Sequence, residues 1–173
     1  MAKRKILIFP NASLRRKAER VVKITDRTRK LAEDMLETMY DAPGIGLAGP
    51  QVGVMQRIFV MDCSPKDGDA DPRVFIDPEL VWESDEVEKR EEGCLSFPGQ
   101  FADVFRPAKV VATFLDIDGD PKEEEFEGIH ARCVQHEIDH LNGKLFIDHV
   151  SLVKRQLIKR KLAKEMQERR ERK

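Results

Sequence analysis

Residues 135–143 have the sequence QHEIDHLNG, in which two histidines are four positions apart and a glutamate follows the first. On a helix, His136 and His140 would lie on one face with Cβ atoms about 6 Å apart. Their ring nitrogens could then bind one metal ion at about 2.0–2.1 Å. Glu137 could exchange protons with water there without being a ligand. Because the chain has only 4 histidines, two unrelated histidines on a polar face are the less favoured interpretation, and the pattern predicts a hydrolytic metal centre.

A catalytic site of this kind needs a third protein ligand. Cys133 is three residues before His136, but a helix rises about 10.5 Å from position 133 to position 140. A short thiol at that end is therefore predicted to form an apolar wall of the pocket rather than to bind the metal.

The best remaining candidate for the third ligand is Cys94, in the segment EEGCLSFPG. Gly93 removes side-chain bulk beside it and Pro98-Gly99 bends the chain, so a turn or short edge strand is expected to present the thiol. One thiolate with two imidazoles suits zinc or ferrous iron. Cys63, after a predicted strand, is expected to have no role.

The segments that must position these residues alternate between strand-like and helical patterns. The glycine-rich segment GIGLAGPQVG is expected to be an irregular loop. Strands are predicted at 6–9, near 57–62, and at 73–76, 80–87, 109–117 and 122–127, and helices at 25–42, at 128–142 and from Ser151 to the end. The order indicates an α+β fold, with small antiparallel sheets packed around a central HExxH-bearing helix, an N-terminal helix and a C-terminal helix.

The composition is that of a globular protein, with 40% hydrophobic and 36% charged residues among 173. We expect one domain, with catalytic residues in 1–150 and a basic helix, 151–173, extending from it. No apolar run is long enough for a membrane helix or a signal peptide. The three cysteines do not suggest a disulfide framework. A cytoplasmic protein is predicted, and the net charge of −1 gives no sign of DNA binding.

The charge is unevenly distributed along the chain. Residues 151–173 contain ten Lys or Arg and three Glu, a net charge of +7, which leaves −8 on residues 1–150. Such asymmetry predicts a polyanionic partner for the tail. The end of the helix, beyond Met166, is expected to project into solvent. Apolar positions that could dock its first part are Val153, Leu157, Ile158, Leu162 and Met166.

Three separated motifs resemble those of the peptide deformylase family: GIGLAGPQ at 44–51, EGCLS at 92–96 and HEIDHLNG at 136–143. They occur in the family's order and spacing, and the resemblance covers essentially the whole chain. It implies a metal-dependent hydrolase that removes the formyl group from N-formylmethionine at the N-terminus of nascent polypeptides and releases formate. It further implies that the enzyme works near the ribosome, which the basic C-terminal helix could contact.

The resemblance also implies roles for individual residues. Cys94, His136 and His140 would be the ligands of one divalent metal, usually Fe²⁺, with Zn²⁺ possible in the isolated protein. Glu137 would be the general acid and base. The carbonyl oxygen would be held by Gln51 and the backbone N–H of Leu95, and Gly46 would contact the substrate.

Four apolar residues flank the motifs and could line a slot for the methionine side chain. Each could equally be an ordinary core residue. They are Ile45, Phe97, Ile129 and Cys133.

Some positions depart from the family or leave alternatives open. Gly49 stands where alanine is common, which predicts a more mobile loop, and Phe101 stands where some members have a substrate-binding arginine. Glu92 and Arg106 match a structural ion pair beside the pocket, although an ordinary surface pair is the alternative.

The sequence is also compatible with two rival functions. An HExxH-type metallopeptidase would take a third ligand downstream of the motif, where Asp148 and His149 are available. A non-enzymatic ribosome-associated module would use only the basic tail.

Overall fold

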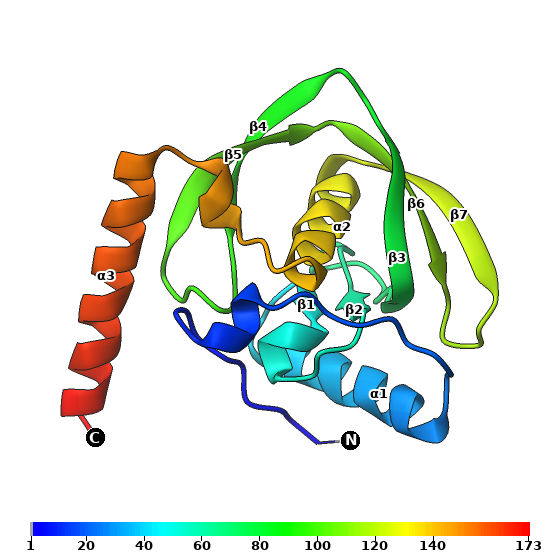
Figure 1. Cartoon of the computed structure of the whole chain (residues 1–173), viewed down its shortest axis with the longest axis horizontal. Helices are drawn as coiled ribbons and strands as arrows, with labels where there is room; N and C mark the ends of the chain where they lie inside the picture. Colours follow the sequence, from blue (N-terminus) through cyan, green and yellow to red (C-terminus); the bar gives the residue numbers. More distant parts are fainter. Residues whose placement is uncertain (1) are drawn as a thin grey trace.

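The computed structural model describes residues 2–173, over which seven strands form two antiparallel sheets (Figure 1). The larger sheet has the order β1-β2-β3-β6-β7, and β4 pairs with β5 in a separate hairpin. The strands are β1 (Gly46–Ala48), β2 (Ile58–Met61), β3 (Arg73–Glu83), β4 (Val87–Gly93), β5 (Phe101–Pro107), β6 (Lys109–Leu115) and β7 (Pro121–Glu127). The helices are α1 (Asp26–Asp41), α2 (Gly128–Leu141) and α3 (Leu152–Glu171), with short 3-10 turns η1 (Ala12–Arg15), η2 (Gly49–Val52) and η3 (Phe146–His149).

Helix α2, which carries the HExxH motif, lies at the centre of the molecule, with the two sheets and α1 around it (Figure 1). Nearly every residue from Ala131 to Leu141 is buried. The helix ends where Gly143 adopts φ +74, and a Cβ there would lie 2.5 Å from the carbonyl oxygen of Arg15. The α+β fold with the motif on a central helix is therefore confirmed.

The outer helices begin at capping residues. The N–H of Lys154 donates to the Ser151 hydroxyl at the start of α3. Helix α3 buries Ile158 and Leu162, whereas Val153 and Leu157 are 72% and 41% exposed. Two of the predicted docking positions are therefore wrong, because the helix contacts the body along a narrower stripe than the sequence pattern suggested.

Within residues 2–173, no helix combines the length and apolar character that crossing a membrane requires.

Three strand predictions differ from the structure. The segments 73–76 and 80–87 belong largely to one strand, β3, whose pairing is interrupted after Ile76, next to Asp77 at φ 49. The β4–β5 hairpin was not predicted, because β4 (VEKREEG) is mainly charged and exposed. Residues 6–9 do not pair with another strand in a ladder. Leu7 N–H donates to Gln51 O in η2 (2.7 Å), and Phe9 N–H donates to Ser96 O in the loop after β4 (3.0 Å).

Candidate metal centre

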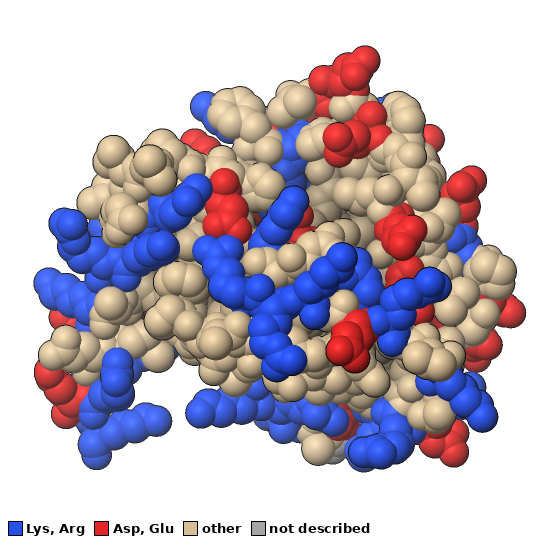
Figure 2. Space-filling model, in the orientation of Figure 1, with Lys and Arg blue, Asp and Glu red and all other residues tan. Residues whose placement is uncertain are grey.

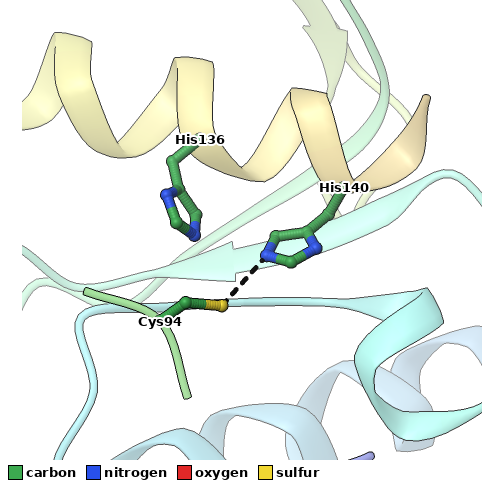
Figure 3. Close-up of side chains that lie close together, drawn as sticks. All are labelled: Cys94, His136 and His140. Carbon is green, nitrogen blue, oxygen red and sulfur yellow. Dashed lines mark hydrogen bonds between the residues drawn. The ribbon is translucent and has the colours of Figure 1, made fainter. Parts of the chain in front are cut away.

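Three potential metal ligands from two parts of the chain meet beside α2. Cys94 directly follows β4, and the rings of His136 and His140 project from α2 toward its sulfur (Figure 3). One donor atom from each lies within 4.8 Å of the other two. Cys94 Sγ is 3.3 Å from His140 Nε2, close to the roughly 3.5 Å that a tetrahedral ion with ordinary thiolate and imidazole bond lengths would impose. The donor set therefore fits a single transition-metal ion.

The surroundings shift the pKa values of the two histidines in opposite directions. Burial lowers the pKa of His140, so its ring is neutral, which is the form that ligates. Burial also lowers the pKa of His136, but hydrogen bonds with Cys94 and Glu92 outweigh this and raise it well above its ordinary value. The extra proton on His136 places a positive charge between its ring and the Cys94 thiol. A bound divalent cation would supply that charge in place of the proton.

Glu92 orients the His136 ring by bonding to Nδ1, the ring nitrogen that faces away from the other two donors. Its Oε1 is 2.9 Å from His136 Nδ1, which leaves Nε2 of that ring facing the other donors. The same carboxylate accepts two hydrogen bonds from Arg106, at 2.5 and 2.9 Å, and one from Arg132 at 2.6 Å. Glu92, Arg106 and Arg132 are all buried. The predicted Glu92–Arg106 pair is confirmed, and the alternative of a surface pair is wrong.

The downstream residues that a metallopeptidase would use do not join the three donors. His149 Nε2 lies 2.8 Å from Asp139 Oδ2, which also accepts from Arg106 at 2.9 Å. Asp148 pairs with Arg15 at 2.6 Å. Both side chains are therefore engaged elsewhere in the structure.

Glu137 is buried beside the ligands, and its Oε2 has no hydrogen-bond partner within residues 2–173. Burial raises its pKa to about 7. Strand β1 passes very close, since a Cβ on Gly46 would lie 2.6 Å from Glu137 Oε1 and 2.8 Å from Cys133 Sγ. Glycine at position 46 is thus required for the strand to reach the helix, and Cys133 faces this strand.

The side chain of Gln51 is fixed on both sides. Its Oε1 accepts from the N–H of Ala48 at 3.0 Å, so its Nε2 faces Cys94 Sγ at 3.5 Å and Ser96 Oγ at 3.1 Å. Ser96 was not assigned a role from the sequence, although it ends the EGCLS motif. The amide is therefore a donor aimed at the centre of the site.

A cavity of about 650 Å³ opens beside these residues. Its lining contains every site residue predicted from the sequence except His140: Ile45, Gly46, Gln51, Cys94, Leu95, Phe97, Ile129, Cys133, His136 and Glu137. Phe97 and Cys133 are almost completely buried, while Ile45 and Ile129 are 45% and 41% exposed on the rim. The cavity therefore has an apolar floor and an open, partly apolar mouth.

The structure shows what surrounds Gly49 and Phe101, the two positions that depart from the family pattern. Gly49 is buried, and a Cβ there would lie 2.7 Å from the carbonyl oxygen of Val54, so the packing favours a tight loop rather than a mobile one. Phe101 is 56% exposed and lines the cavity. A Cβ on Gly93 would meet its ring at 2.6 Å. Arg169 of α3 also lines the cavity and was not expected from the sequence.

A thiol and two imidazoles converging beside a buried carboxylate, on a helix within an α+β fold, define a metal-dependent hydrolase of the HExxH class. Residues 3–156 match the family model described as "Polypeptide deformylase". A peptide deformylase of Afipia carboxidovorans is 52% identical over 164 residues, covering 95% of this chain and 96% of that protein. One of Rhodopseudomonas palustris is 51% identical over 166 residues, covering 95% of each.

Solved structures show the same likeness. A peptide deformylase from Legionella pneumophila has a TM-score of 0.91 at 43% identity, covering 97% of this chain and 98% of that one. One from Ehrlichia chaffeensis, in complex with actinonin, has a TM-score of 0.90 at 39% identity, covering 95% and 98%. The chain belongs to the polypeptide deformylase family. It is a hydrolase that removes the formyl group from N-formylmethionyl peptides, and these similarities do not support the metallopeptidase alternative.

The geometry predicts that Cys94→Ser loses its metal whereas Cys133→Ser retains it, because only Cys94 Sγ lies among the histidine nitrogens. Iron and zinc per chain, measured after anaerobic purification, check this. Cys63→Ser is a matched control for loss of an unrelated thiol. Metal retained by Cys94→Ser but lost from Cys133→Ser would reverse the assignment.

Proposed function

We propose that Cys94, His136 and His140 hold one divalent metal ion and that the adjoining cavity binds the formylmethionyl end of a peptide. The observation that carries this is the convergence of the three donors beside Glu137, whose buried Oε2 has no partner within the described chain. A donor set of one thiolate and two imidazoles admits both Fe²⁺ and Zn²⁺. We assign Fe²⁺ as the native ion, with Zn²⁺ as its replacement in isolated protein, and the anaerobic metal analysis tests this.

Glu137 is the proton carrier of the reaction. A bound divalent ion would supply Lewis acidity, which lowers the pKa of water so that hydroxide is available to attack the formyl carbon near neutral pH. Glu137 takes the proton that this water loses and delivers it to the departing amine nitrogen as the C–N bond breaks. Its position beside the ligands, and its free Oε2, suit both transfers.

The formyl oxygen gains negative charge during the attack and needs hydrogen-bond donors. Gln51 Nε2 and the backbone N–H of Leu95 take this role in our proposal. Since Nε2 is 3.1 Å from Ser96 Oγ, the substrate oxygen would replace that hydroxyl as its acceptor. One such donor typically contributes about 2.7–4 kcal/mol to the stability of the transition state.

The apolar part of the cavity is the methionine slot. Phe97 and Cys133 form its floor, and Ile45 and Ile129 its rim. An unbranched thioether fills an irregular apolar space well. Gly46, on the strand that borders Glu137, contacts the peptide next to the reacting bond.

The basic helix α3 offers a second surface, which we assign to the ribosome. Lys and Arg side chains gather along α3 and over the adjoining face of the body (Figure 2). Exposed cations on residues 151–173 are Lys154, Arg160, Lys161, Lys164, Arg169, Arg170, Arg172 and Lys173. A cytoplasmic enzyme acting on nascent chains would be held near them by ribosomal RNA phosphates. Residues 1–150 and 151–173 thus act as the catalytic part and a basic extension of one domain.

Glu137→Ala is expected to keep its metal and its fold but to lose about 10²–10⁴-fold in kcat. Formate release from a formyl-Met tripeptide measures the loss. Glu91→Gln is the matched control, because Glu91 also lines the cavity but is exposed. A metal-replete Glu137→Ala protein with near-normal turnover would show that another group carries the proton.

The slot predicts at least a tenfold lower kcat/KM for formyl-Asp than for formyl-Met peptides, because a carboxylate would lose its hydration among apolar residues. Formyl-norleucine, with an unbranched chain of similar length, should remain within a few-fold of formyl-Met. Formate-release kinetics with the three peptides check both statements. Equal values for formyl-Met and formyl-Asp would refute the slot.

Replacing Arg160, Lys161 and Lys164 by Gln should weaken co-sedimentation with ribosomes. The slope of log K for ribosome binding against log salt concentration should become shallower by about 2–3. Substitution is a cleaner test than truncation, because Leu162 is buried. A control variant changes Lys23, Arg27 and Lys66, which are exposed but lie outside α3. If both variants bind as the parent chain does, α3 is only a solvated helix.

A further inference from the structure

The end of α3 lies at the mouth of the substrate cavity. Met166 is partly buried and packs against the apolar cluster that contains Phe97. Arg169, three residues further on, lines the cavity itself. Most of residues 167–173 are exposed, as expected from the sequence, but the helix end borders the active site rather than simply projecting away from it.

The loop between β4 and β5 contacts α3 at Glu165, one turn before Arg169. Gln100 Nε2 lies 3.5 Å from Glu165 Oε2. Gly99 adopts φ +74, and a Cβ there would approach the same oxygen to 3.0 Å. Arg169 Nη2 in turn donates to Glu165 Oε1 at 2.7 Å. The guanidinium is thus positioned at the rim by a contact between α3 and the loop that follows Cys94.

Arg169 differs from the other charged residues around the cavity in being an exposed cation. The other arginine of the lining, Arg132, is buried and bonded to Glu92. Glu137 is also buried, whereas Glu91 is exposed. Among the lining residues that the structure describes, Arg169 is therefore the one exposed Lys or Arg, with a side chain that is 51% exposed.

The partner of Arg169 does not prevent it from binding a further anion. An exposed i, i+4 pair such as Arg169–Glu165 contributes only about 0.3–0.5 kcal/mol. Guanidinium carries five N–H donors, and within residues 2–173 the hydrogen bond of this side chain to a carboxylate uses Nη2. Donors therefore remain for a carboxylate that approaches from the cavity.

We propose that Arg169 is a specificity-determining residue that binds a carboxylate of the peptide downstream of formylmethionine. The proposal rests on the cavity being the peptide-binding site, as argued above. The carboxylate can come from the C-terminus of a short substrate or from an Asp or Glu side chain of a longer one. Arginine suits both sources, because its planar fork matches a carboxylate.

The test compares KM for formyl-Met-Ala-Ser as the free acid and as the C-terminal amide, and for formyl-Met-Ala-Asp amide, at low and high salt. The parent enzyme should show a KM about 2–5-fold lower for each carboxylate-bearing peptide than for formyl-Met-Ala-Ser amide, because a partly exposed ion pair contributes up to about 1 kcal/mol. The preference should shrink at 1 M salt, where charges are screened within about 3 Å. A preference for only one of the two peptides identifies the source of the carboxylate.

Arg169→Gln should abolish the KM preference, while Arg172→Gln should retain it. Arg172 is a matched control, because it pairs with Glu168 at 3.6 Å and does not line the cavity. An unchanged preference in Arg169→Gln would overturn the proposal, as would a parent enzyme with no preference at all. Absence of formate release from every peptide would instead contradict the proposed function.

Discussion

The carboxylate of Glu92 lies below the surface between two arginines and His136, and each partner comes from a neighbouring element. Burial raises its pKa, but hydrogen bonds from His136 and Arg106 outweigh this and hold it well below its usual range. Arg132 also donates to the carbonyl oxygens of Val104 and Glu88. The network thereby fastens the β4–β5 hairpin to α2, and Cys94, two residues after Glu92, is carried to the histidines. Removing one partner of a buried ion pair typically costs about 3–5 kcal/mol.

Close backbone approaches complete the site around this network. Strand β1 can lie against α2 because Gly46 has no side chain to meet Glu137 and Cys133. The N-terminal segment bonds to the backbone of Gln51 through Leu7 and to that of Ser96 through Phe9, so the amide and the thiol are held from the same side. The polar groups to which we assign roles in the reaction are therefore held by the protein's own contacts, as electrostatic stabilisation of a transition state requires.

In our proposal, the cavity combines two kinds of recognition in different places. Its buried part is apolar and suits an uncharged side chain, whereas its mouth is bordered by α3, from the most basic segment of the chain. The same helix carries the cations assigned to ribosome binding. Under these two proposals, a single element would bring the enzyme close to nascent chains and contribute to the binding of their first residues.

The sequence by itself determined the central helix, the family and the three donors that meet beside that helix, because HExxH spacing acts within one helix and the three motifs are short and local. It could not reveal the β4–β5 hairpin, whose charged residues give no hydrophobic alternation. It also placed residues 6–9 in a strand, although they bond to η2 and to the loop after β4. Tertiary structure alone decided that Glu92 and Arg106 are buried with Arg132, and that Arg169 reaches the cavity. These contacts join residues 14 or more positions apart, and burial of a charge depends on partners that local sequence does not specify.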